Sequence, residues 1–282
     1  PCAGMLVSMY PFMDSSYCHH VPSWIKGEYP FLTIDATYFK ARENHRIISK
    51  AFMIAYATDD QGHREILGFG VYANESKETW KSFIRDLKAR GLRNVLMITS
   101  DAHEGLCDAI SKEFPQAAWQ RCQFHFSKNI AEKAPKKYQA GIRSELSEMF
   151  NCTTIEEARR KRDSIIADYQ DVAESAMTCL DEGFESSMTA MILPKYLRQY
   201  FRTSNHIERI NRELKRRSKV IGVFPNEASI LRLMGSVLME LNDTAQARKA
   251  LFSPKTYNNL MSAEVKSKLI ILANEQHLLR VS

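Results

Sequence analysis

The sequence has no long hydrophobic run. None of the apolar stretches in its 282 residues approaches the ~20 residues that a membrane-spanning helix needs. Residues 1–20 mix cysteine, proline, aspartate and histidine and contain no signal-peptide core, so nothing in them favours export. These absences predict a cytoplasmic protein that is not inserted in a membrane.

Regular cysteine spacing, internal repeats and low-complexity linkers are missing as well. The six cysteines are scattered, which argues against a disulfide framework and favours free thiols in a reducing compartment. Hydrophobic residues make up 44% and charged residues 26%, as in an ordinary globular protein with room for one large domain or two smaller ones. The cysteines are Cys2, Cys18, Cys107, Cys122, Cys152 and Cys179.

Positive charge is present and is unevenly spread. The net charge is only +6, but residues 209–219 hold six cations against Glu213 alone, a local net charge of +5. Such a run is compatible with a solvated helix face or with a binding surface for a polyanion such as DNA. The cations, and thus the candidate DNA-binding residues, are Arg209, Arg212, Lys215, Arg216, Arg217 and Lys219.

The first hundred residues alternate strand and helix signals. Residues 31–39 and 46–58 are rich in β-branched and aromatic residues, "DDQGH" at 59–63 is a turn signal, and 65–73 predicts a third strand. A helix follows, with Ser76 as its N-cap, apolar residues at helical spacing and Gly91 at its end.

A second set of elements completes the pattern of an α/β core. The apolar run 94–101 predicts a strand buried on both faces, 104–114 a helix, and "AAWQRCQFHF" at 117–126 a fifth strand. Three strands, helix, strand, helix, strand (βββαβαβ) is the order of a ribonuclease H-like mixed sheet. We therefore predict that fold class.

The rest of the chain reads as helical. Residues 127–202 lack strand signals and include "TTIEEARRKRDSIIADYQDVAESA", and 228–241 predict a further helix with Asn226 as N-cap. We expect an all-helical insertion before the last catalytic helix. The predicted divisions are 1–25, a remnant of an amino-terminal region; 26–126, the first part of the core; 127–202, the insertion; 203–245, the final part of the core; and 246–282, a helical tail.

Three acidic residues stand where a carboxylate needs an explanation. Asp35 interrupts an apolar strand, where an unpaired charge is costly. Its structural explanation is that this face of the strand is exposed or that a nearby cation pairs with it. Asp101 follows the fourth strand, and Asp101-x-x-Glu104 fits a capping box. Asn205-x-x-Glu208 fits the same template. Each acid therefore has a structural reading beside a catalytic one.

Taken together, the three acids favour a metal site. In a ribonuclease H-like sheet the first and fourth strands are neighbours, so Asp35 and Asp101 would face one another and repel unless a divalent cation lies between them. Glu208, on a late helix, would complete an oxygen-ligand site suited to Mg²⁺ or Mn²⁺. Two such ions can drive in-line displacement at a phosphodiester.

The helix that begins near Asn205 supports this interpretation. Its apolar residues Ile207, Ile210 and Leu214 are spaced to dock on the sheet. A neighbouring face would carry one acid followed by cations, an arrangement that could hold a DNA backbone over the site. That face contains Glu208, Asn211, Arg212 and Lys215.

At these residues the sequence resembles the mutator-type transposases of bacterial insertion sequences, a group of DDE recombinases. The resemblance runs from about Trp24 to Asp243 and rests on five blocks in the family's order. These are "LTIDATYFK", "GLRNVLMITSDAHEGL", "FPQAAWQRCQFHF", "TSNHIERINRELKRRSKVIGVFPNEASILRL" and "LMELND".

The resemblance implies a catalytic triad and an activity. It maps two aspartates onto Asp35 in "IDAT" and Asp101 in "SDAH", and the glutamate onto Glu208 in "NHIERIN", with Glu213 as the nearest rival. It implies Mg²⁺- or Mn²⁺-dependent DNA cleavage and strand transfer on a ribonuclease H-like fold. It further implies insertion-sequence ends and target DNA as partners, a homo-oligomer on DNA, and a bacterial protein at the nucleoid when bound.

Three further residues are candidates for shaping the site. Cys122-x-x-His125 has the spacing of half a zinc site, to which Cys18, His19 or His20 could add ligands. We favour a buried thiol and a core histidine on a strand, because no second half-site has proper spacing. The family shares this pair, which implies a role near the second aspartate. His103 could orient a phosphate or water, or do neither.

The chain departs from the family at both ends. Family members carry a helical DNA-binding region before the first catalytic strand, whereas only about thirty residues precede Asp35 here and they do not match it. We therefore expect an amino-terminally truncated copy. The alternatives are an inactive remnant that binds DNA or partner transposase, and a nuclease of the same fold.

Overall fold

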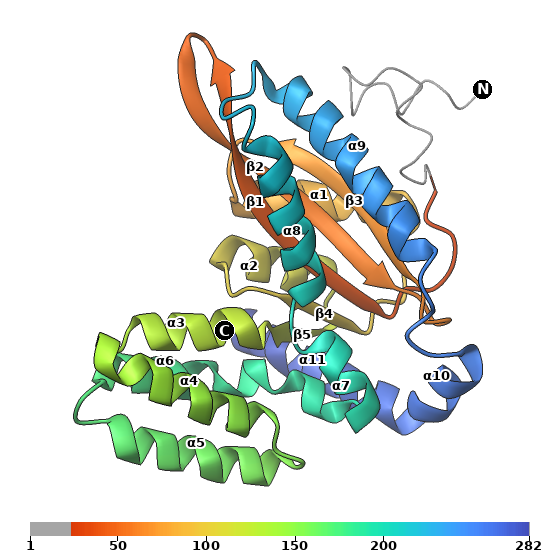
Figure 1. Cartoon of the computed structure of the whole chain (residues 1–282). Helices are drawn as coiled ribbons and strands as arrows, with labels where there is room; N and C mark the ends of the chain where they lie inside the picture. The colour runs from red at the N-terminus through yellow and green to blue at the C-terminus, as the bar shows by residue number, and fades with distance from the viewer. Residues whose placement is uncertain (1–23, 282) are drawn as a thin grey trace.

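The computed structural model describes residues 24–281 and shows an α/β protein with one mixed sheet of five strands. The strand order across the sheet is β3-β2-β1-β4-β5 (Figure 1). The predicted chain order of three strands, helix, strand, helix, strand is confirmed. The strands are β1 (Phe31–Glu43), β2 (Arg46–Thr58), β3 (Arg64–Tyr72), β4 (Met97–Ser100) and β5 (Ala118–Arg121).

Strands β1, β2 and β3 form an antiparallel meander, and β4 and β5 extend the sheet in parallel to β1. Strand β1 is longer than predicted, because its pairing with β2 continues to Glu43 opposite Arg46. Asn44 and His45 between them both have positive φ angles, 49° and 63°, which closes a tight two-residue turn. The expected turn at 59–63 is also present, with Gly62 at φ 84°.

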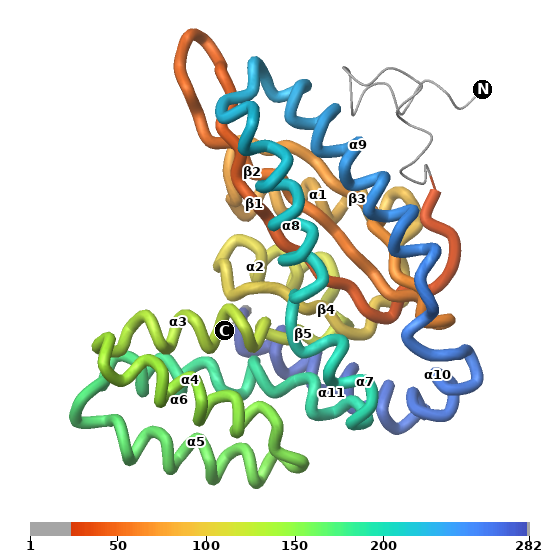
Figure 2. Tube along the Cα trace, in the orientation of Figure 1, coloured from red at the N-terminus to blue at the C-terminus, as the bar shows by residue number. Residues whose placement is uncertain are grey.

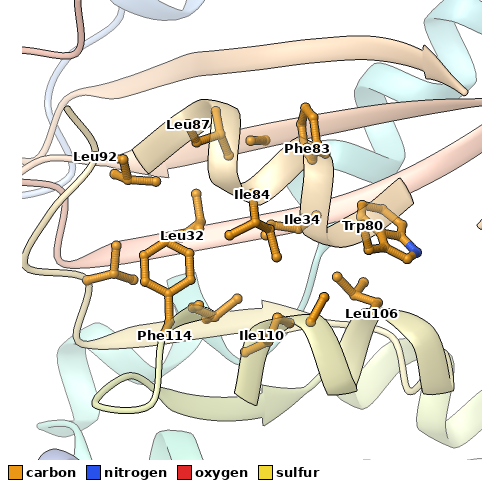
Figure 3. Packing of buried hydrophobic residues seen from close by; sticks show 14 of the residues in the cluster. Leu32, Ile34, Trp80, Phe83, Ile84, Leu87, Leu92, Leu106, Ile110 and Phe114 are labelled. Atoms are coloured by element: carbon orange, nitrogen blue, oxygen red, sulfur yellow. The ribbon is translucent and has the colours of Figure 1, made fainter. Parts of the chain in front are cut away.

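One face of the sheet is covered by α1 (Lys77–Ala89) and α2 (Glu104–Glu113). Even-numbered residues of β1, such as Leu32 and Ile34, point into this core, where Trp80 and Phe83 of α1 fill the space (Figure 3). Ser76 caps α1 as predicted, accepting a hydrogen bond from the Thr79 backbone, and a glycine with positive φ follows the helix.

The opposite face is covered by α8 (Asn205–Ser218) and α9 (Glu227–Gln246), which cross the meander in Figure 1. Odd-numbered residues of β1, such as Phe39, point to this side and contact Ile207 and Leu214 in one cluster. The predicted docking stripe of α8 is therefore confirmed. Asn226 caps α9 as predicted, through a 2.9 Å hydrogen bond from the Ser229 backbone to its side chain.

Between β5 and α8 the chain is helical and has its own core. The fifth strand is shorter than predicted: it ends at Arg121, where β4 offers its last partner, Ser100. The Phe126 amide then bonds to the Cys122 carbonyl and starts a helix, so Cys122 and His125 do not lie on a strand. The elements are α3 (Gln123–Glu132), α4 (Lys136–Phe150), α5 (Ile155–Tyr169), α6 (Glu174–Ser187), η1 (Thr189–Ile192) and α7 (Lys195–Phe201).

The last two helices are α10 (Pro254–Leu260) and α11 (Ala263–Val281), and the tube in Figure 2 shows the chain turning back through them toward the sheet. Gln276 of α11 bonds to both backbone groups of Trp119, accepting from the amide at 2.7 Å and donating to the carbonyl at 2.9 Å. The helix thus covers the β5 edge. None of the helices within 24–281 is long and apolar enough to cross a lipid bilayer.

Candidate active site

Asp35 and Asp101 are brought side by side by the pairing of β1 with β4. In that parallel register Thr33 lies opposite Thr99, and each aspartate follows its threonine by two residues. Asp35 is an odd residue of β1, so its side chain points to the α8 face of the sheet. The predicted neighbourhood of the two strands is therefore confirmed.

Asp35 is buried in an environment that disfavours its charge. Its exposed fraction is 8%, and the Asn211 side-chain amide donates a 2.8 Å hydrogen bond to Asp35 Oδ2. Burial, followed by the charge of Asp101 and by smaller contributions from Glu75 and Glu208, raises the pKa of the Asp35 carboxyl to about 8. Carboxylates from β1, the end of β4 and α8 thus repel one another here.

The side-chain oxygen of Asn211 is a further possible ligand for a cation beside these carboxylates. It lies one turn after Glu208 on α8, and while its amide nitrogen bonds Asp35, its buried oxygen Oδ1 has no hydrogen-bond partner among residues 24–281. A carbonyl oxygen beside mutually repelling carboxylates is the donor set that Mg²⁺ and Mn²⁺ prefer. The residues present fit a hard divalent cation.

The end of α7, just before α8, is tied to the sheet and to α3, which positions the start of α8 and with it Glu208. Thr99 Oγ1 donates a 2.6 Å hydrogen bond to the Phe201 carbonyl, and the Gln123 amide bonds to the Arg202 carbonyl at 3.1 Å. The helix begins after Ser204, not at a capping Asn205, so the predicted capping box with Glu208 is wrong. The reason is that the helix already includes Asn205, so Glu208 is its fourth residue and not the third, which a capping box requires.

Glu208 is held by side chains from α3 and from the turn before α8. The Ser204 hydroxyl lies 3.1 Å from Glu208 Oε1 and 3.1 Å from Cys122 Sγ, and His125 Nε2 lies 3.6 Å from the same glutamate oxygen. Glu208 is half-buried, with 18% of its side chain exposed. The carboxylate therefore has a fixed orientation rather than that of a free surface side chain.

Cys122, His125 and Glu208 form a second group with metal-ligand chemistry. One ligand atom from each lies within 4.8 Å of the others. Burial raises the pKa of the Cys122 thiol, so this sulfur is not a ready thiolate ligand, and it already accepts bonds from Ser204. The extra ligands predicted for zinc, Cys18, His19 and His20, lie outside the described residues. The choice between a structural pair and half a zinc site stays a prediction.

The loop after β4 differs from the predicted capping box. His103, the residue immediately before α2, occupies the N-cap position without a side-chain bond, and Asp101 Oδ1 accepts a 3.2 Å bond from the His103 amide instead. Asp101 is thus turned back on its own loop. That short turn fixes the carboxylate at the end of β4, close to Asp35.

Glu75 is a fourth acid at this site that sequence analysis missed. It precedes α1, and burial together with the charge of Asp101 raises its pKa, while a hydrogen bond from Tyr38 lowers it. It stands in a loop, without helical or strand periodicity, and it belongs to no block that carried the family resemblance. No signal in the sequence marks it as part of the site.

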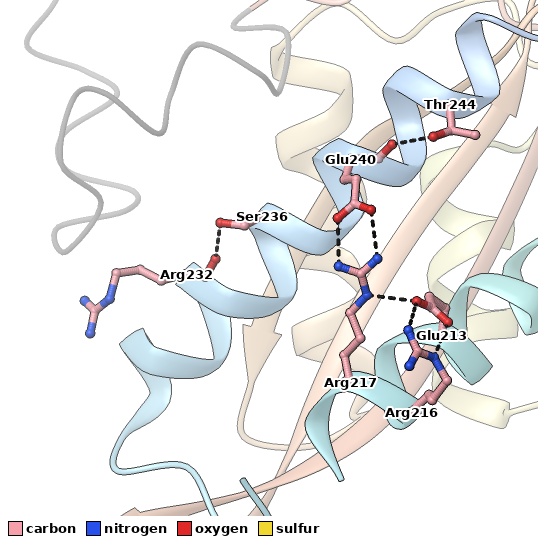
Figure 4. Close-up of polar contacts among 7 residues, drawn as sticks. All are labelled: Glu213, Arg216, Arg217, Arg232, Ser236, Glu240 and Thr244. Carbon is pink, nitrogen blue, oxygen red and sulfur yellow. Dashed lines mark hydrogen bonds and ion pairs between the residues drawn. The ribbon is translucent and has the colours of Figure 1, made fainter. Parts of the chain in front are cut away.

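The cations of α8 are not equivalent in space. Arg216 and Arg217 both bond to Glu213, and Arg217 also forms two bonds with Glu240 of α9, at 2.7 and 2.8 Å (Figure 4). Hydrogen bonds from the two arginines hold the pKa of Glu213 at about 2. Glu213 is therefore engaged toward α9, about 140° around the helix from Glu208.

The remaining cations differ again. Lys215 Nζ donates to the Tyr38 carbonyl and lies 4.8 Å from the centre of the Phe39 ring, so it packs along β1. Arg209, Arg212 and Lys219 are exposed, and their side chains make no ion pair within the described part of the chain. Half of the predicted DNA-binding cations thus remain available to a polyanion.

The comparisons agree with this combination of fold and residues. The family model described as "Transposase, Mutator family" matches residues 23–247. The chain belongs to the Mutator family of transposases, which confirms the family predicted from the sequence.

Named relatives support the same assignment. The chain is 40% identical over 233 residues to the transposase for insertion sequence element IS256 in transposon Tn4001 of Staphylococcus aureus, covering 82% of this chain and 58% of that protein. It is 37% identical over 217 residues to the transposase for IS1081 of Mycobacterium tuberculosis, covering 77% and 52%. The chain spans little more than half the length of these curated relatives.

Proposed function

We propose that this chain is the catalytic core of a DDE-type DNA transposase with a ribonuclease H-like fold. It would cleave one strand at the end of an insertion sequence and join the freed 3′-hydroxyl to target DNA. The observation that carries the proposal is the convergence of Asp35, Asp101 and Glu208 from β1, β4 and α8. The predicted divisions, with a helical insertion at 127–202, and a homo-oligomer on DNA belong to the same proposal.

Asp35, Asp101 and Glu208 would hold one or two Mg²⁺ or Mn²⁺ ions, with the Asn211 oxygen as a further donor to the ion or its water. Such ions activate the attacking oxygen and stabilise the leaving oxygen of a phosphodiester. The chain's own part is orientation. Asn211 holds Asp35, and Ser204 with His125 holds Glu208, so that the carboxylates are placed before DNA arrives.

The test is strand cleavage and joining on a labelled element-end duplex with Mn²⁺. Asp35→Asn, Asp101→Asn and Glu208→Gln should each lower cleavage by ~10³-fold or more, as losses of central electrostatic groups do. Glu213→Gln is the matched control, because it removes a carboxylate from the same helix that faces α9. Wild-type cleavage by folded Glu208→Gln, or its loss only in Glu213→Gln, would refute the assignment.

The same assay separates the alternatives. A nuclease of this fold would hydrolyse the strand without producing joined products, whereas a transposase forms both. An inactive remnant would bind DNA with no Mn²⁺-dependent product at all. The exposed Arg209 and Arg212 favour DNA binding in either case, so binding alone does not decide between them.

A further inference from the structure

A pocket of about 400 Å³ lies on the side of α8 that faces α9, between that helix, α9 and the ends of β2 and β3. Its volume falls within the ~300–1,000 Å³ usual for small-ligand sites. Most of its polar wall is cationic. The residues that matter for its chemistry are Tyr56, Arg64, His206, Arg209, Arg212 and Arg248.

The positive charge of this arginine pocket is not neutralised. Glu213 is the one carboxylate among the described residues that line it, and it already bonds to Arg216 and Arg217. The four other arginines, from β3, α8 and the segment after α9, form no ion pair within residues 24–281. Like charges gathered from three segments repel one another, so an anion would stabilise the pocket.

His206 gives the pocket a neutral donor at its base. Its ring stacks on buried Tyr56 with centroids 6.0 Å apart, and Arg64 Nη1 lies 3.5 Å from His206 Nδ1. Since arginine can only donate, Nδ1 accepts and Nε2 carries the proton. The imidazole can therefore donate a hydrogen bond without adding charge.

We propose that the arginine pocket binds a phosphodiester group of the DNA strand that enters the active site. Guanidinium groups match phosphate oxygens in charge and geometry, and they hold a backbone without reading its bases. The proposal rests on the proposed function, because it assigns the DNA path across α8. It adds Arg64, Arg248 and His206, which lie outside the predicted basic run.

The position of the pocket favours a polymer over a free anion. Arg212 at its rim follows Glu208 by four residues, about 6 Å along α8. Tyr56 at its base pairs with Thr33 of β1, two residues from Asp35. Pocket and acidic site thus occupy the same face of the sheet. A DNA strand with one phosphate in the pocket could continue over α8 to the carboxylates. A free phosphate would make no contact beyond the pocket, so it would not benefit from the nearby acidic site.

The experiment compares a pocket arginine with an adjacent lysine of equal charge. Arg248→Gln should weaken binding of a short DNA duplex about tenfold for every sequence and flatten the log–log salt dependence by about one unit. Lys249 is the next residue and does not line the pocket, so Lys249→Gln should change neither the DNA affinity nor its salt dependence. Arg64→Ala should behave as Arg248→Gln, and melting temperatures confirm folding.

Competition identifies the source of the phosphate. Inorganic phosphate and ATP should displace DNA only at concentrations where their ionic strength alone explains the loss. If Arg248→Gln abolishes ATP binding but leaves DNA affinity unchanged, or if it binds DNA like Lys249→Gln, the inference fails. The duplex titration needs no cleavage. An inactive wild-type protein would therefore refute the proposed function alone, while active enzyme with unaltered pocket variants would refute the pocket alone.

Discussion

The two sides of α8 gather charge of opposite sign in different settings. On one side, buried Asp35 meets Asp101 and Glu208 in a hydrogen-bonded centre. On the other, Arg209 and Arg248 are exposed at the rim of the arginine pocket. Buried charges are costly without a partner, whereas exposed ones are screened by water and salt. The acidic side should therefore control chemistry and folding, and the basic side DNA affinity.

A second contrast lies within the basic run itself. Arg217 is locked between Glu213 and Glu240, while Arg212 is exposed and makes no ion pair with any described residue. The two residues are five positions apart and look alike in sequence. A local charge of +5 therefore overstates what a DNA backbone would meet, because α9 supplies carboxylates that the linear run does not show.

The largest effect concerns the pH dependence of the metal-free protein. The pKa of Asp35 is about 8 in the folded state and ~3.9 when unfolded, so the folded state binds more protons between these values. The free energy of unfolding should fall as pH rises from about 4 to 8, by at most ~6 kcal/mol. Urea unfolding in a chelator measures this fall.

The Asp35→Asn variant has no ionisable group at this position. It should therefore lose most of the pH-dependent fall in the free energy of unfolding. The variant should be more stable than the wild type at pH 8 in chelator, although it should not cleave DNA. Mn²⁺ should restore the wild type at pH 8 and do little for the variant, since it binds the ionised acids. If the stability of the two proteins depended on pH in the same way, the pKa of Asp35 would not be raised by burial and by the neighbouring acids.

On the basic side of α8, His206 should give the free energy of unfolding the opposite dependence on pH, at lower pH. The pKa of His206 is about 4 in the folded state against ~6.5 unfolded, so the unfolded state binds more protons in this window. Stability should be lost as pH falls from about 6.5 to 4, by at most ~3 kcal/mol. His206→Gln should flatten this limb in urea titrations, whereas exposed His45→Asn should not.

Sequence patterns could predict the elements that local chemistry determines. Alternation and turn residues indicated the first four strands, and the adjacency of β1 and β4 followed from the expected fold order, so Asp35 and Asp101 could be paired in advance. Glu208 could be added because it begins a basic helix with an apolar stripe. These features depend on periodicity over many residues, and periodicity survives in a single sequence.

Contacts made by residues at the edges of elements could not be predicted. Glu75, Arg64 and Arg248 stand at the edges of elements, where no repeat marks their direction, and only packing brings them to their sites. His125 was placed on a strand because the short apolar run at 117–126 fits strand and buried helix alike. The end of pairing with β4, a tertiary event, decided that the helix begins at Gln123.

A smaller effect should follow from loosening Glu208. Ser204→Ala removes the buried hydroxyl that lies 3.1 Å from Glu208 Oε1. Losing a partner that orients a metal ligand typically costs 10–100-fold, so cleavage turnover should fall by about that factor while DNA affinity is unchanged. Thr203→Ala, the preceding residue, is the control. A purely structural role for Ser204 would lower the melting temperature and leave the turnover of folded protein intact.

The smallest effect separates paired from unpaired cations on one helix. Arg217→Ala breaks bonds to Glu213 and Glu240 that are screened by solvent, so it should lower stability only slightly in urea titrations. Because that guanidinium is already neutralised by α9, its loss should leave the salt dependence of DNA binding almost unchanged. Arg212→Ala should instead flatten the log–log slope by about one unit at little cost in stability. If Arg217→Ala flattens the slope as much as Arg212→Ala does, then DNA competes successfully with Glu240. The difference between paired and unpaired cations on α8 would then depend on whether DNA is bound.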